Sequence, residues 1–128
     1  MKWINLALIS LAIITSSGCA TLADSVAAKG TGPSKVYSAS KELVWPVAVD
    51  AVKYSDLDLV SESKESGMIL AQRGITAFSY GENVAIFVEA ENEKSCRVEV
   101  VSKKAMATNV FAPDWSSTIF KRLDAAFK

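Results

Sequence analysis

The clearest pattern along the chain is an alternation of apolar and polar residues in its second half. Every second residue is apolar over residues 83–90, and the alternation returns over residues 95–102 after the polar run 91–94. Such a pattern predicts a β-hairpin. Residues 57–64 and 68–73 predict an earlier hairpin, joined through 65–67, where Gly67 can adopt a left-handed turn conformation. Residues 36–38 predict a short first strand.

Two segments have helical periodicity instead. Residues 41–54 follow Ser40, which suits a helix N-cap, and their apolar side chains span roughly 240° of the helix circumference. Pro46 lies inside this segment and removes one backbone hydrogen bond, so the helix either begins later than Ser40 indicates or bends there. Residues 115–128 predict a second helix, with an apolar arc of roughly 140°.

The order strand, helix, hairpin, hairpin, helix favours an α+β fold. We expect an antiparallel sheet of four to five strands with both helices packed on one face, because such a sheet can bury one face and leave the other wet. The apolar arc of the first helix is wider than one sheet can cover. Its far edge, Trp45 and Val49, lies roughly 200° to 240° round from Leu43.

Two interpretations of that far edge remain open. If Leu43 faces the sheet, Trp45 cannot face it too, so either the second helix covers Trp45 and Val49 or they form an exposed surface that a partner protein buries. A core tryptophan contributes more to the free energy of unfolding than an exposed one. Mutation of Trp45 therefore separates the two interpretations.

The N-terminal segment has the features of a targeting signal. Lys2 gives it a positive start, residues 3–14 are almost wholly apolar, and the small residues 15–18 lead to Cys19. The apolar run is too short to cross a bilayer, which takes about 20 residues. An ordinary secretory signal with a chance cysteine and an uncleaved membrane anchor are the alternatives.

The small residues and the cysteine together resemble the lipobox of bacterial lipoproteins, although Ser16 stands where leucine is usual. The resemblance implies cleavage before Cys19 and acylation of its thiol, with palmitate among the acyl chains, and therefore a lipid-anchored protein. By the same analogy, Ala20 after the cysteine implies the outer membrane, with the protein facing the periplasm. Several acyl chains at ~0.8 kcal/mol per buried methylene make such an anchor effectively permanent.

Residues 20–34 are mostly small or polar and have no sustained periodicity, which is typical of a flexible tether. The predicted organisation is a signal peptide over residues 1–18, a lipidated flexible tether over 19–34 and a single α+β periplasmic domain over 35–128.

Charge and residue types exclude several function classes. The 14 basic and 14 acidic residues balance, and removal of the leader with Lys2 would leave a net charge of −1, so nucleic-acid binding is not expected. The pair Lys103 and Lys104 is interpreted as ordinary surface charge. The chain contains no histidine, which excludes Ser–His, Cys–His and histidine-dependent zinc sites.

The remaining reactive groups have structural interpretations. Cys96 alternates with valines in a predicted strand, so we expect an inert thiol in the core. The clustered carboxylates flank predicted turns and strand ends, where solvated charge is ordinary. No catalytic, cofactor or metal site is therefore predicted, and the chain is not expected to be an enzyme. The carboxylates concerned are Asp56, Asp58, Glu89, Glu91 and Glu93.

The order of the elements and two short motifs resemble small Gram-negative outer-membrane lipoproteins of unknown function, and more distantly the periplasmic domains of the outer-membrane assembly lipoprotein BamC. The motifs are Gly67-x-Ile69-x-Ala71 and Trp115-x-x-x-Ile119-x-x-x-Leu123. The resemblance spans roughly residues 36–127, with Pro46 as a departure, and it implies an accessory or scaffolding protein without a cofactor.

Two functions follow as hypotheses. One is a membrane-tethered, non-catalytic interaction or accessory module of the cell envelope, which contacts lipid through Cys19 and a partner protein through its surface. The alternative is a carrier or sensor of a small apolar ligand between helices and sheet. A carrier needs an unfilled cavity, and large aromatics on both helices leave little volume in a domain this small. The sequence therefore favours the interaction module.

Overall fold

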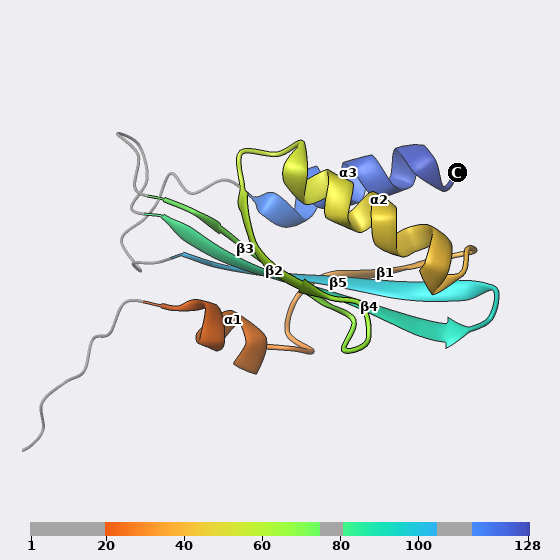
Figure 1. Cartoon of the computed structure of the whole chain (residues 1–128), viewed down its shortest axis with the longest axis horizontal. Helices are drawn as coiled ribbons and strands as arrows, with labels where there is room; N and C mark the ends of the chain where they lie inside the picture. The colour runs from red at the N-terminus through yellow and green to blue at the C-terminus, as the bar shows by residue number, and fades with distance from the viewer. Residues whose placement is uncertain (1–19, 75–80, 105–113) are drawn as a thin grey trace, which may run out of the picture.

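The computed structural model describes residues 20–74, 81–104 and 114–128 (Figure 1). The described elements follow one another as α1 (Leu22–Ala27), β1 (Ser34–Tyr37), α2 (Lys41–Lys53), β2 (Asp58–Ser63), β3 (Met68–Arg73), β4 (Glu82–Asn92), β5 (Ser95–Lys104) and α3 (Trp115–Ala126).

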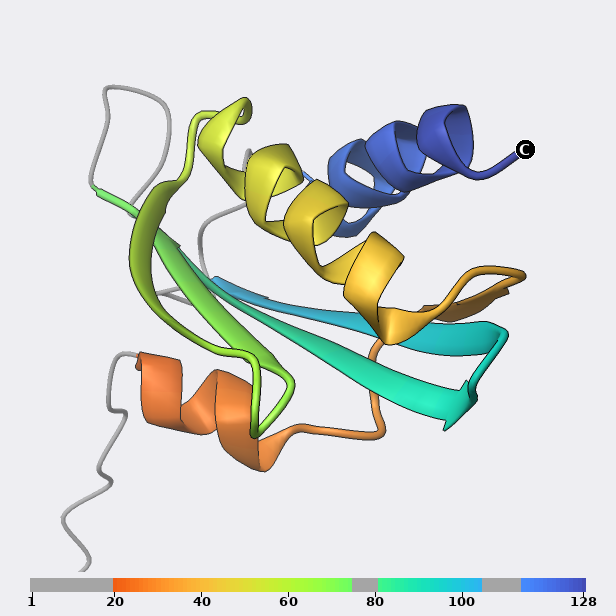
Figure 2. The same cartoon turned by 45° about the vertical axis from the view of Figure 1, so that its right-hand side comes forward.

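The strands form one open antiparallel sheet of five strands in the order β1-β5-β4-β3-β2. Helices α2 and α3 lie side by side on one face of this sheet, and the short α1 lies on the other (Figures 1 and 2). The predicted α+β class, the number of strands and the placement of two helices on one face are confirmed. Helix α1 is an addition that the sequence pattern did not predict.

The hairpin β4–β5 forms the centre of the fold. Its alternating apolar residues all point to the α2–α3 face, where Ile86 pairs with Val100 and Val88 with Val98 across the strands. These four side chains are fully buried. The turn before β3 also follows the prediction, since Gly67 has a φ of 70°, in the region that only glycine adopts at little cost.

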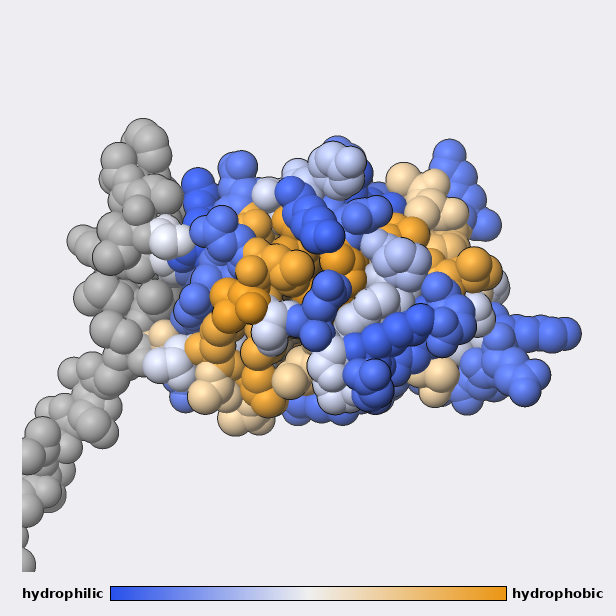
Figure 3. Space-filling view, viewed as in Figure 1, coloured by the Kyte–Doolittle hydropathy of each residue, from blue (hydrophilic) through white to orange (hydrophobic). Residues whose placement is uncertain are grey.

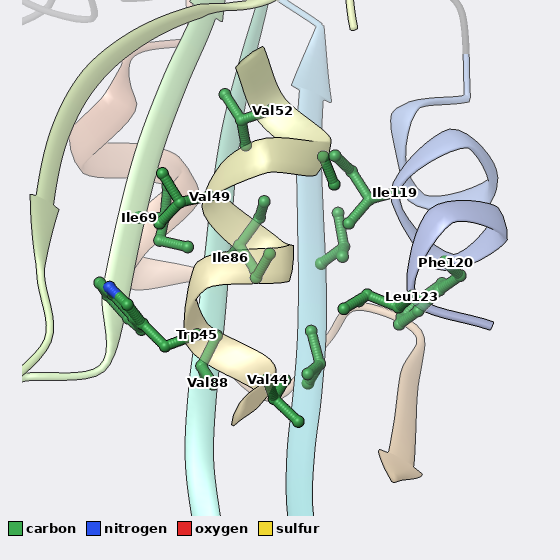
Figure 4. Packing of buried hydrophobic residues seen from close by; sticks show 14 of the residues in the cluster. Val44, Trp45, Val49, Val52, Ile69, Ile86, Val88, Ile119, Phe120 and Leu123 are labelled. Atoms are coloured by element: carbon green, nitrogen blue, oxygen red, sulfur yellow. The ribbon is translucent and has the colours of Figure 1, made fainter. Parts of the chain in front are cut away.

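Helix α2 contacts the sheet through a different stripe from the one expected. Leu43 is 61% exposed, whereas Val44 and Val52 are fully buried. Trp45 and Val49 are only 8% and 6% exposed, and they lie on the side of α2 away from α3, with Val49 beside Ile69 of β3 (Figure 4).

The hypothesis that Trp45 and Val49 form an exposed partner surface is therefore wrong. The other interpretation, in which the second helix covers Trp45 and Val49, is also wrong, because both residues lie on the side of α2 away from α3 (Figure 4). The twisted sheet extends beyond α2 on the β3 side, and this edge of the helix packs against it. Helix α3 packs along the opposite edge through Ile119, Phe120 and Leu123 (Figure 4).

Helix α2 begins at Lys41, directly after Ser40, with Pro46 inside it. The backbone N–H of Val44 donates to the Ser40 carbonyl, so the first turn is regular. Proline lacks the N–H that would reach the carbonyl of Glu42, one turn earlier. Both Pro46 and Glu42 are exposed, so water can bond the carbonyl instead.

Residues 20–34 do not form a flexible tether, and this prediction is corrected. Thr21 and Asp24 form a capping box at the start of α1, in which the Thr21 N–H donates to the Asp24 carboxylate over 2.6 Å. Leu22 and Val26 lie one turn apart and are half-buried. The cap and the apolar pair order this short segment, so the folded region includes residues 20–34 and is not limited to residues 35–128.

Candidate functional site

The strongest candidate for a functional feature is the segment 20–33, which we call the docked segment. Its start is bonded to Asn83 of β4, whose side-chain amide donates to the Ala20 carbonyl over 2.9 Å. The buried Ser25 hydroxyl donates to the Asn83 backbone carbonyl over 3.1 Å. Gln72 of β3 donates to the Asn83 side-chain oxygen over 2.8 Å and so fixes the orientation of the amide.

The end of the docked segment is bonded to a buried carboxylate. Glu99 of β5 is 5% exposed and accepts hydrogen bonds from the N–H of Gly30, at 2.7 and 3.0 Å, and from the N–H of Gly32, at 2.9 Å. Backbone donors compensate the cost of burying this charge. Gly30 has a φ of 92°, and a Cβ at Gly32 would overlap the Val100 carbonyl oxygen, so both positions require glycine.

Apolar contacts complete the attachment. The docked segment lies over a small cluster in which Ala85, Phe87 and Val101 are buried, separate from the main core. The Lys29 ammonium lies 5.2 Å from the centre of the Phe87 ring and also pairs with Glu89. The docked segment thus contacts the face of the sheet opposite α2 and α3, through polar and apolar groups at both of its ends.

Basic residues occupy the two rows of the sheet nearest the start of the docked segment. Lys103 pairs in register with Asn83, and Arg73 and Lys104 are the register partners of Glu82 in the next row. Arg73 also lies 5.5 Å from the Trp115 ring. The sequence analysis interpreted Lys103 and Lys104 as ordinary surface charge, because it had no means of placing them in the same rows of the sheet as Asn83 and Arg73.

A second polar cluster joins β1 to α3. The Tyr37 hydroxyl donates to one oxygen of Asp124 over 2.8 Å, and Lys35 donates to the other over 2.6 Å. Burial, together with the Asp124 contact, raises the pKa of Tyr37, and the hydrogen bonds from Lys35 and Tyr37 lower the pKa of Asp124. A phenol whose pKa is raised is a poor base at neutral pH, so the cluster is best suited to positioning α3.

That cluster borders a surface hollow of about 590 Å³, which Val36 and Phe127 also line. The hollow lies beside β1 and the end of α3, and not between the helices and the sheet where a ligand carrier would hold an apolar molecule. The space between helices and sheet is instead filled by core side chains (Figure 4).

Exposed apolar residues lie elsewhere on the surface. Apolar residues gather over β2 and β3, between α2 and α1 (Figure 3). Val60 of the edge strand β2 is 49% exposed. Elsewhere, Leu43 of α2 is 61% exposed, and Tyr54, which follows α2 and lies beside Arg122 of α3, is 70% exposed. A partner could reach these side chains, whereas Trp45 and Val49 are buried.

The other predicted site residues have separate outcomes. Cys19, the predicted lipid attachment site, and the predicted signal peptide over residues 1–18 lie outside the described residues. Cys96 is fully buried and burial raises the pKa of its thiol, which agrees with the predicted core thiol. The Glu99 carboxylate was missed, although a lone glutamate among the valines of a buried strand was a signal for it.

Within residues 20–74, 81–104 and 114–128, no cluster of three or more His, Cys, Asp or Glu side chains has the arrangement of a metal site. The helices of this part of the chain are each too short or too polar to cross a membrane. No protein-family model matches the chain, and no curated protein matches its sequence.

Proposed function

We propose that this chain is a bacterial lipoprotein, cut before Cys19 and acylated on that residue. The charged start, the short apolar run and the small residues before the cysteine support this assignment. The observation that carries it is the order of these three features, which end at Cys19. The Ala20 carbonyl accepts a hydrogen bond from Asn83, so every contact of the docked segment described here lies on the C-terminal side of the proposed cut and would remain after it.

The proposed location is the outer membrane, with the protein facing the periplasm. Ala20 follows the cysteine, and in lipoproteins of this kind a residue other than aspartate there accompanies sorting to the outer membrane. The burial of Cys96 as a free thiol suits an oxidising compartment, because the core protects it from disulfide exchange.

The proposed role is a non-catalytic interaction or accessory module of the cell envelope. The absence of histidine from the chain supports it, as does the use of Glu99 and Asp124 in contacts between elements. The exposed side chain of Val60 supports contact with a partner protein. The ligand-carrier alternative has less support, because the cluster between helices and sheet is densely occupied.

Metabolic labelling tests the lipid anchor. Bacteria that express the full chain are grown with a clickable palmitate analogue, and we expect labelled, processed protein. Cys19→Ala should abolish the label and leave unprocessed precursor, whereas the matched control Cys96→Ala should label normally. Equal labelling of the Cys19→Ala protein would refute the proposal.

Site-specific crosslinking tests the interaction role. A photoreactive residue at position 60 of the full lipoprotein should give a discrete adduct in intact cells, and the same residue at position 94, in the turn between β4 and β5, should not. The same adducts from both positions would mean that contact at β2 is not specific and would argue against the module.

A further inference from the structure

We infer that the domain rests directly against the phospholipid head groups, with the end of the sheet that carries Arg73, Lys103 and Lys104 facing the bilayer. This inference rests on the proposed acylation of Cys19 and adds an orientation to it. It replaces the expectation of a domain that moves freely at the end of a spacer.

The covalent geometry limits where the anchor can be. The Cα atom of Cys19 lies about 3.8 Å from that of Ala20, because one peptide bond joins them. The Ala20 carbonyl is in turn bonded to Asn83, in the row of the sheet that also contains Lys103. A flexible spacer of 15 residues would allow a separation of roughly 20 Å between anchor and domain. The docked segment leaves no such spacer.

The attachment of the docked segment resists its release. Asn83 and Ser25 bond its first half, Glu99 bonds its second half through Gly30 and Gly32, and apolar contacts with the sheet lie between them. Lifting the domain off the membrane on an extended chain would require breaking these bonds and exposing the apolar cluster together. The anchored end of the domain therefore stays near the lipid.

The charges of the two ends of the sheet agree with this orientation. Arg73, Lys103 and Lys104 lie at the end where α1 begins and outnumber the acidic Asp58 and Glu82 of the same two rows. Basic groups are attracted to lipid phosphates. The opposite end of these strands carries Glu91 of β4 and the turn residues Glu93 and Lys94, two acidic and one basic side chain, and would be distant from the anionic head groups (Figure 1). The occupant that fits the basic end is an anionic phospholipid surface.

Depth-dependent quenching of fluorescence tests the orientation. The acylated full chain, in a Cys96→Ala background, is labelled at Lys104→Cys or, as the matched control, at Lys94→Cys. It is then reconstituted in vesicles of phosphatidylethanolamine and phosphatidylglycerol with head-group nitroxide lipids. The two positions are separated by the length of β5, ten residues at about 3.3 Å each. We expect several-fold stronger quenching at position 104.

A second variant keeps the experiment decisive. A flexible Gly-Ser insertion between Cys19 and Ala20 lengthens the link between the anchor and the first bonded residue, and it should reduce the quenching at position 104 towards that at position 94. Equal quenching at both positions in acylated protein without the insertion would overturn the inference while leaving the lipid anchor intact. Absence of the acyl chains by mass spectrometry would instead contradict the proposed function.

Discussion

The two faces of the sheet are built from different interactions. On the α2–α3 face, fully buried apolar side chains such as Ile69, Ile86 and Leu123 form one large cluster. On the α1 face the apolar cluster is small, and the buried residues include Asn83 and Glu99. Apolar burial is strong but non-directional, whereas hydrogen bonds fix a geometry. The first face therefore supplies most of the stability, and the second fixes where the N-terminal segment lies.

The largest effect that tests this comparison is on the α2–α3 face. Trp45→Ala should lower the free energy of unfolding by about 3 to 5 kcal/mol, because it removes a buried aromatic side chain and leaves a cavity. Leu43→Ala, on the same helix but 61% exposed, should change it by less than about 0.5 kcal/mol. Denaturant melts measure both. A loss of under about 1 kcal/mol for Trp45→Ala would show that the face tolerates a cavity there.

A smaller and more local effect is expected on the α1 face. Glu99→Gln replaces a carboxylate oxygen by an amide N–H that opposes a backbone donor of Gly30 or Gly32, and should cost about 1 to 3 kcal/mol. Proteolysis should then cut residues 20–33 before the sheet unfolds. Arg97→Gln, at an exposed position of the same strand, is the control. Unchanged protection of the segment in Glu99→Gln would mean that apolar contacts alone dock it.

Backbone conformation in the docked segment gives a third test. Gly30→Ala should cost about 1 to 2 kcal/mol, because alanine is strained at the φ of 92° found there although space is open around it. Gly74→Ala also has open space but no positive φ, so it should be neutral or slightly stabilising. Melting temperatures of the two variants compare them directly. Equal melting temperatures would argue that residues 28–33 adopt another conformation in solution.

The smallest expected effect concerns Asp124. Its lowered pKa means that the ionised carboxylate favours the folded state at neutral pH, and that this contribution is lost as the pH falls below about 4. Asp124→Asn should therefore lower the denaturant midpoint slightly at pH 7, and the difference from the parent chain should vanish in acid. A difference that persists at low pH would assign the effect to the shape of the side chain and not to its charge.

Much of the fold was predictable because local patterns agreed with tertiary packing. Valine and isoleucine recur at every second position in the centres of β4 and β5, and Gly67 lies at the turn where a left-handed conformation is needed. The packing partner of Trp45 was not predictable. Helical periodicity gives the width of an apolar arc, but it does not say which part of the sheet that arc contacts. The centre of the buried stripe lies at Val44 and Val52, and not at Leu43.

The docked segment was not predicted for a different reason. A helix of six residues is too short for periodicity to identify, and its stability comes from distant partners such as Asn83 and Glu99. The local signal was the spacing of Thr21 and Asp24, which is that of a capping box. Small residues are common both in tethers and in segments that pack closely on a sheet, so composition alone favoured the wrong interpretation.

The irregularity in β2 affects how neighbouring copies of the protein meet. The register with β3 shifts between Leu59 and Ser61, which leaves Val60 in a bulge of this edge strand. At the other edge of the sheet, β1 is only four residues long. Bulges and short edge strands obstruct the addition of a further strand from another molecule. Under the proposed lipid anchor, copies of the protein would collide often in the plane of the membrane, and these two edges would let them crowd without polymerising into a continuous sheet.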